Sequence, residues 1–199
     1  MVNDKHKLLF VHISKTGGVS MTHYLRQIGG IKHHKRATTL KQNLYFNSEY
    51  QNYRKFSIVR NPWDRVFSAY TFYKSKKIAD FLLDKDIEFN DWIKIIYKPE
   101  YKHLTHHKLS IQLLHIGNQY NWLIDHRNKI CMDFILRFEN INKDFDEFTQ
   151  KFNLPQRELL HKNKSIHEHY TEIYDDESID IVSKFCKKDI KYFKYRYEG

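Results

Sequence analysis

The chain has 199 residues, with 34 Lys and Arg against 24 Asp and Glu, which gives a formal net charge of +10. An aromatic content of 16% excludes a disordered chain, and 6 glycines with 3 prolines exclude a collagen-like or linker-rich one. The two cysteines, Cys131 and Cys186, are too few for a disulfide scaffold, and no apolar run reaches the ~20 residues of a membrane-spanning helix.

These bounds predict a single domain over residues 1–199, because a chain of this length buries most of the surface that it exposes when unfolded. The apolar stretch after Lys7 is too short for a signal peptide, so we expect a cytoplasmic protein. The positive charge suits nucleic acid, an anionic membrane or a small polyanion. Because lysines are spread along the chain, charge alone does not choose among these partners.

The first predicted elements are a strand, a glycine turn and a helix. The apolar run at 7–13 is typical of a buried strand, and 14–18 interrupts it. Apolar side chains at helical spacing follow over 19–28, and Gly29 and Gly30 end that helix.

A second unit of the same kind follows. Residues 56–59 are predicted as a strand and 63–76 as a helix, with Pro62 at the first helical position. A third strand is predicted at 132–136. Further helices are predicted at 79–83, 89–97, 109–116, 144–152 and 178–192. Strands alternating with helices predict an α/β fold, with a parallel sheet covered on both faces.

The turn between the first strand and helix is a candidate anion site. The backbone N–H groups at a helix start, together with the helix dipole, attract an anion, and Gly17 and Gly18 let it approach. Lys15 adds positive charge, while Thr16 and Ser20 add hydroxyl groups. A plain strand–helix turn is the alternative.

This turn does not have the Walker A pattern of ATPases and GTPases. In that pattern the lysine directly follows a glycine, whereas Lys15 precedes Gly17 and Gly18. No Asp that would hold magnesium is evident at the end of a neighbouring strand. An ordinary ATPase or GTPase is therefore disfavoured.

A second basic turn follows the second strand. Arg60 stands at the carboxyl edge of the predicted sheet, where open α/β sheets bind ligands. Arg65 and Ser68 are three positions apart and share a helix face, so a guanidinium and a hydroxyl can hold one phosphate. An ion pair of Arg60 or Arg65 with Asp64 is the alternative. Two such sites at two strand ends predict one ligand with phosphates at two positions.

Together these turns resemble the sulfotransferases that use 3′-phosphoadenosine 5′-phosphosulfate (PAPS). The Lys15–Ser20 loop resembles the 5′-phosphosulfate loop of that family, and Arg60 with Ser68 resembles its 3′-phosphate motif. Later segments are similar to the carbohydrate branch, which is the family 2-like one. These segments are 119–123, 133–141, 163–165, Tyr170, Tyr174 and 189–197.

The resemblance implies a P-loop-like three-layer fold with a central parallel sheet flanked by helices. It implies in-line transfer of a sulfuryl group from PAPS to a hydroxyl of an oligosaccharide, polysaccharide or glycolipid, without a metal. Lys15 would stabilise the leaving phosphate. The other implied donor contacts are Thr16, Gly17, Gly18, Val19 and Ser20 at the 5′ end, Arg60 and Ser68 at the 3′ end, and Arg65 and Lys164 beside them.

An acceptor hydroxyl needs a general base, and His is suited to that role near neutral pH. In related carbohydrate sulfotransferases a His stands in a place comparable to His34, which is therefore our first candidate, with His33 second. The pair at 106–107 is a rival. The basic residues Lys32, Lys35 and Arg36 would steer an anionic saccharide.

Two other functions remain open from the sequence. One is a nucleotide or small-molecule kinase, which would need Mg²⁺ and a Walker A loop. The other is a basic nucleic-acid-binding protein, which the charge and the aromatic content would suit. The sulfotransferase hypothesis expects no nucleic-acid partner.

Overall fold

The computed structural model describes residues 1–31, 50–75, 86–97, 116–125, 127–160 and 169–198. The chain forms two compact units, and each consists of two separate segments. The first unit comprises 1–60 and 119–165, and the second comprises 61–118 and 166–199.

The first unit is built on a four-stranded sheet with the order β1-β2-β3-β4. Its strands are β1 (Val2–Asn3), β2 (Leu8–Val11), β3 (Arg54–Val59) and β4 (Phe134–Arg137). β2, β3 and β4 are parallel, whereas β1 pairs with β2 in the antiparallel direction. The sequence does not predict β1, because two residues are too few to carry a pattern.

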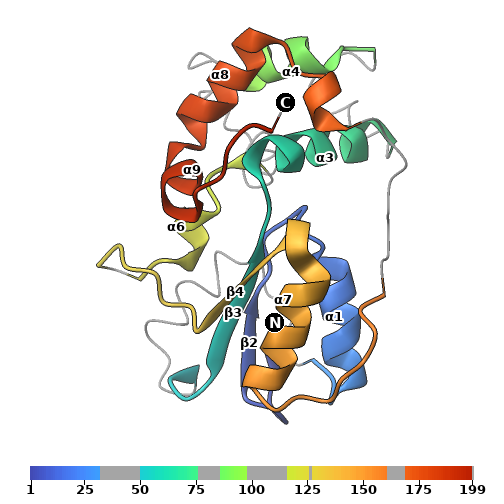
Figure 1. Cartoon of the computed structure of the whole chain (residues 1–199), viewed down its shortest axis with the longest axis vertical. Coiled ribbons are helices and arrows are strands. Elements are labelled where there is room, and N and C mark those ends of the chain that lie inside the picture. The colour runs from blue at the N-terminus through green and yellow to red at the C-terminus, as the bar shows by residue number, and fades with distance from the viewer. Residues whose placement is uncertain (32–49, 76–85, 98–115, 126, 161–168, 199) are drawn as a thin grey trace, which may run out of the picture. The chain divides into compact units, whose positions relative to one another are not determined.

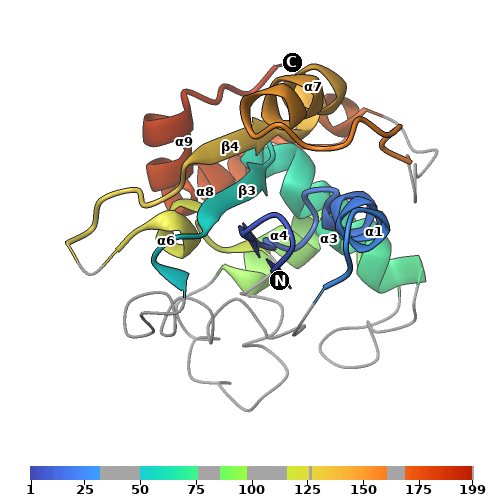
Figure 2. The same cartoon turned by 90° about the horizontal axis from the view of Figure 1, so that it is seen from below.

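Two helices cover one face of this sheet, α1 (Gly18–Gln27) after β2 and α7 (Ile141–Lys151) after β4. Figures 1 and 2 show both on the same side of the strands. The apolar side chains that meet there are Leu8, Phe10, Phe56, Ile58 and Leu136 from the strands, Met21, Tyr24 and Leu25 from α1, and Phe145 and Phe148 from α7.

Aromatic rings fix the register of the sheet. Phe10 pairs with Phe56, and Phe56 with Phe134, so a row of phenylalanines crosses the three parallel strands. The ring centroids of Phe10 and Phe56 lie 5.0 Å apart, and those of Phe56 and Phe148 lie 4.4 Å apart. A slip by one residue would turn these rings to the other face, so the core specifies the register.

The prediction of an α/β fold with a mostly parallel sheet flanked by helices is confirmed, including the P-loop-like strand–loop–helix start. The short elements α6 (Tyr120–Leu123) and η4 (Phe138–Asn140) complete the helices of this unit within the described residues.

The second unit is helical where it is described. Its elements are α3 (Pro62–Ser75), α4 (Phe89–Ile96), η5 (Tyr170–Glu172), α8 (Asp176–Phe185) and α9 (Lys187–Phe193). Pro62 opens α3 as predicted, and the Asn61 Oδ1 atom accepts from the Trp63 backbone N–H at 3.1 Å. The helices predicted at 79–83 and, apart from its last residue, at 109–116 lie outside the described residues.

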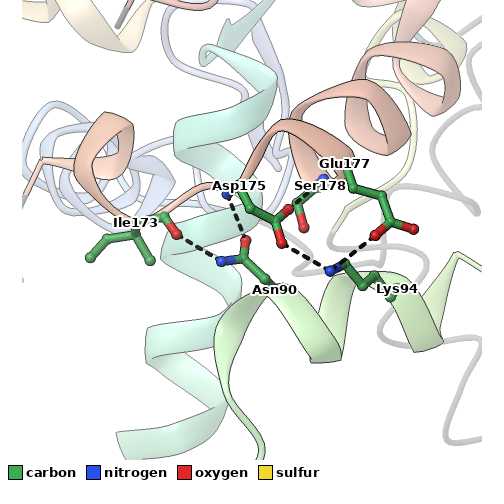
Figure 3. Close-up of polar contacts among 6 residues, drawn as sticks. All are labelled: Asn90, Lys94, Ile173, Asp175, Glu177 and Ser178. Carbon is green, nitrogen blue, oxygen red and sulfur yellow. Dashed lines mark hydrogen bonds and ion pairs between the residues drawn. The ribbon is translucent and has the colours of Figure 1, made fainter.

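Polar contacts join α4 to the start of α8 (Figure 3). Asp175 caps α8, because its Oδ1 atom accepts from the Ser178 backbone N–H at 2.7 Å. Lys94 on α4 pairs with Asp175 at 2.9 Å and with Glu177 at 3.0 Å. The amide of Asn90 donates to the Ile173 carbonyl at 2.9 Å and accepts from the Asp175 backbone N–H at 3.2 Å.

The single helix predicted over 178–192 is wrong, since α8 ends at Phe185 and α9 begins at Lys187. Cys186 forms the break, and its Sγ atom lies 3.7 Å from the Ile116 carbonyl oxygen. The redirected chain buries Asp189, whose charge acts on the buried Arg65. Apolar periodicity does not reveal such a break, because both helices keep an apolar face.

Candidate active site

The loop between β2 and α1 has an unusual backbone. Lys15 has a φ of 67° and Gly17 a φ of 79°, both in the left-handed region. For a lysine this conformation costs roughly 1–2 kcal/mol, so the surrounding structure must hold it in place. α1 then begins at Gly18, and its first N–H groups lie at the end of the loop, as an anion site requires.

Thr16 holds this loop onto the strand end. Its side chain is buried, and its Oγ1 donates to the Ile13 carbonyl at 2.8 Å. The sequence predicts Thr16 as a donor contact, and its hydroxyl proton is directed to the backbone instead.

Packing inside the protein leaves no room for a Cβ atom at Gly18 and little at Gly17, whose φ of 79° also favours glycine. A Cβ atom on Gly18 would lie 2.1 Å from the ring of His12, and one on Gly17 would lie 3.0 Å from the ring of Phe138. From the sequence, we expect these glycines to let a ligand approach the backbone. The structure adds a second cause, because the rings of His12 and Phe138 take the space beside the loop. Neither ring was predicted as part of the site.

Lys15 and Arg60 lie together, so the structure brings one residue of each predicted anion motif to one place. The Arg60 Nη1 atom donates to the carbonyl oxygen of Lys15 at 3.2 Å. Burial lowers the pKa of Lys15 to about 8, and the positive charge of Arg60 acts in the same direction. Two cations held close together in a partly buried place favour the binding of an anion between them.

Arg60 is held at both its side chain and its backbone. Its guanidinium carbon lies 4.2 Å from the centroid of the Phe138 ring, a cation–π contact. The Gln119 side chain accepts from the Arg60 backbone N–H at 2.9 Å and donates to the Arg60 carbonyl at 2.7 Å. Arg60 directly follows β3, so these contacts fix the predicted phosphate-binding residue at the sheet edge.

Sequence reasoning gave Gln119 and Phe138 no role beyond their similarity to the carbohydrate branch. Phe138 directly follows β4, as Arg60 follows β3. Because the carboxyl ends of parallel strands meet at one edge, the topology could have placed Phe138 with the site. No pattern in the sequence identifies Gln119, since its partner Arg60 is 59 positions away.

The other two predicted 3′ contacts, Arg65 and Ser68, lie on α3 in the second unit, and both are buried. Arg65 is 1% exposed, and its Nη1 atom donates to the Gly117 carbonyl at 2.7 Å. Burial lowers the pKa of Arg65, and the charge of Asp189 opposes that shift. These internal partners give Arg65 a structural role, and its contact with a cofactor stays a prediction.

The predicted bases His34 and His33 lie outside the described residues, as do Lys164 and the pair at 106–107. Within the described ranges, no three His, Cys, Asp or Glu side chains come together as a metal site would require. None of the helices in these ranges combines the length and apolar character needed to cross a membrane.

Comparison with known proteins gives one match. A family model described as the Sulfotransferase family matches residues 1–196, which include segments of both units. No curated protein and no solved structure matches the chain. The family match covers the loop at Lys15, Arg60 and Gln119, which contact one another in the structure.

Proposed function

We propose a specific reaction for this chain, which belongs to the Sulfotransferase family and is therefore a transferase of sulfuryl groups. The donor is PAPS, the acceptor is a hydroxyl of a carbohydrate, and residues 1–199 act as one catalytic domain. The observation that carries the proposal is the contact between Arg60 and the Lys15 loop, at 3.2 Å. It supports one ligand with two anionic ends.

The residues of the first unit suit the charges of this donor. The donor supplies an activated sulfuryl group. When this group is transferred, the bond between sulfur and the bridging oxygen breaks, and the 5′-phosphate keeps an additional negative charge. The Lys15 ammonium is suited to neutralise that charge, and the N-terminus of α1 to hold the same phosphate. Arg60 meets the 3′-phosphate with its guanidinium fork. In-line transfer of this kind depends mainly on positioning and charge stabilisation, and these residues provide both.

The remaining donor contacts follow the resemblance of the sequence. Val19 and Ser20 lie in the first turn of α1 and extend the 5′ site. Ser68 and Lys164 are further proposed contacts of the 3′-phosphate, on the sequence alone. The preference for a carbohydrate acceptor rests on the segments that are similar to the carbohydrate branch of the family. Two residues of these segments, Gln119 and Phe138, contact Arg60.

Calorimetric titration with adenosine 3′,5′-bisphosphate (PAP), with ATP and Mg²⁺, and with a short oligonucleotide tests the donor. We expect PAP to bind most tightly, and Arg60→Ala to weaken PAP binding by about 10- to 100-fold, the size of a lost charge-assisted contact. Arg54→Ala is the matched control, because it removes the same charge from the opposite end of β3. Equal binding of ATP would support a kinase, and preferred binding of the oligonucleotide would support the nucleic-acid alternative.

The general base is proposed as His34, with His33 second, on the sequence alone. We expect His34→Ala to lower turnover with a saccharide acceptor by about 100-fold or more, the usual contribution of general base catalysis. Binding of PAP should stay unchanged, since the base acts on the acceptor. If His33→Ala has this effect and His34→Ala does not, the order of the two is reversed.

A further inference from the structure

The side-chain amide of Gln119 makes the two hydrogen bonds to the Arg60 backbone that the backbone of a neighbouring strand would otherwise make. Its Oε1 accepts from the Arg60 N–H at 2.9 Å, and its Nε2 donates to the Arg60 carbonyl at 2.7 Å. The Gln119 side chain is 0% exposed. One primary amide thus binds both polar backbone groups of a single residue, where water does not compete for them.

The contact between Gln119 and Arg60 lies directly after the last paired residue of β3. The last pair in the register of β3 and β4 is Val59 with Arg137, and β2 ends at Val11 opposite Ser57. Arg60 is the next residue, and it is only 8% exposed. A buried backbone N–H or carbonyl without a partner costs free energy comparable to a lost hydrogen bond. Gln119 supplies the partner that the strands no longer provide.

The contact also fixes the direction of the Arg60 side chain. Holding the N–H and carbonyl of one residue restricts both of its backbone dihedrals, and these set the direction of the Cα–Cβ bond. The guanidinium then lies 4.2 Å from the Phe138 ring centroid and 3.2 Å from the Lys15 carbonyl oxygen. Binding residues of this kind depend on a supporting shell that holds them to within roughly 0.5 Å.

We propose that Gln119 is a positioning residue for recognition of the 3′-phosphate of the donor. It acts through Arg60 and does not touch the donor itself. The proposal rests on the proposed function, in which Arg60 meets the 3′-phosphate. It requires that loss of the Gln119 amide weakens binding of a ligand with a 3′-phosphate, and leaves binding of the same ligand without it nearly unchanged.

The test compares the dissociation constants of PAP and of adenosine 5′-phosphate, which lacks the 3′-phosphate, by calorimetry on the full chain. Their ratio measures selectivity for that phosphate. Gln119→Met keeps the size of the side chain and removes both hydrogen bonds. We expect it to lower the ratio by about fivefold, the equivalent of one hydrogen bond of average strength. The constant for adenosine 5′-phosphate should change less than twofold.

Asn3→Ala is the matched control. Asn3 is a buried amide of the same unit, and it also binds backbone groups, donating to the Leu25 carbonyl at 3.1 Å and to the Gly30 carbonyl at 3.0 Å. Its loss should lower the thermal midpoint of unfolding while the selectivity ratio stays that of the wild type. A general loss of stability therefore does not imitate the expected result.

A double-mutant cycle with Arg60→Ala completes the test. If Gln119 acts through Arg60, then Gln119→Met lowers the ratio no further once Arg60 is absent. A folded Gln119→Met variant with the wild-type ratio, or a further fall in the Arg60→Ala background, would overturn the proposal.

If Gln119→Met does not fold, Gln119→Asn replaces it, because an amide one methylene shorter keeps the polarity but does not reach both groups. The same fall in the ratio supports the proposal, and a wild-type ratio overturns it. A wild-type protein without preference for PAP over adenosine 5′-phosphate would overturn the proposed function itself, and this proposal with it.

Discussion

At the scale of single residues, Lys15 combines a left-handed backbone, partial burial and a neighbouring positive charge. Its φ is 67°, and burial together with the charge of Arg60 lowers its pKa to about 8. Burial and the neighbouring charge make the charged form of Lys15 less favourable in the free protein, and they make its interaction with a bound anion more favourable. An ammonium group that is poorly solvated in the free protein gains more from an anion than an exposed lysine does.

The lowered pKa predicts how donor binding depends on pH. Below about pH 8 Lys15 carries its proton and attracts the anionic donor, and above that value the free protein loses this charge. Affinity for PAP should therefore fall as the pH rises from 7 to 9.5, with the bend near 8. Titration calorimetry at half-unit intervals measures this profile.

Two variants of the same residue serve as controls for this profile. Lys15→Arg keeps its charge over the whole range and should give a flat profile, because guanidinium does not titrate there. Lys15→Ala should bind more weakly and be flat as well, with turnover reduced more than affinity. A wild-type affinity that is constant from pH 7 to 9.5 would contradict the role of the Lys15 charge in binding.

At the scale of elements, the start of α8 shows how one side chain serves two functions. Asp175 accepts from the Ser178 N–H as a helix cap and pairs with Lys94 on α4 (Figure 3). The ammonium of Lys94, as the main cause, lowers the pKa of Asp175 below its usual 3.8. The cap is the larger contribution, because ion pairs this exposed to solvent add little to stability.

Asp175→Ala should therefore lower the free energy of unfolding by about 1 kcal/mol, the usual value of a helix cap. Asp175→Asn keeps the Oδ1 acceptor and should cost less. Urea unfolding at pH 7 measures both. Since the pKa is lowered in the folded protein, the carboxylate stabilises it above about pH 4, and this contribution is lost as the pH falls through the lowered value.

Asp180→Ala is the matched control for the cap, because Asp180 lies on the same helix and pairs with Lys184 without capping it. Its loss should lie within roughly 0.5 kcal/mol of the wild type, as for most exposed positions. If Asp180→Ala costs as much as Asp175→Ala, charge and not capping determines the stability of α8.

At the scale of the whole molecule, the sequence predicts the first strand, loop and helix and the turn at Arg60, and it does not predict the distant residues that contact Arg60. The strand–loop–helix start and the turn at Arg60 are continuous in sequence, so local patterns reveal them. Gln119 and Phe138 are far from Arg60 along the chain, and the fold brings them into contact with it. Periodicity carries no information about such partners.

The charge of +10 is likewise only partly explained by the site. Lys15 and Arg60 are assigned to the donor by the proposal, whereas Arg65 faces the buried Asp189. The sequence of a motif with several arginines does not show which arginine interacts with a buried carboxylate of the protein and which is available to a ligand. The partner Asp189 lies on α9, a helix whose start at Lys187 the sequence pattern did not predict.

The position of Gln119 along the chain has a consequence for how the protein is made. Chains fold as they are synthesised, from the N-terminus onward, and contacts between distant positions form slowly. Lys15 and Arg60 leave the ribosome first, and the amide that fixes Arg60 follows 59 positions later. A nascent chain therefore carries both anion-binding motifs long before it carries the residue that aligns them.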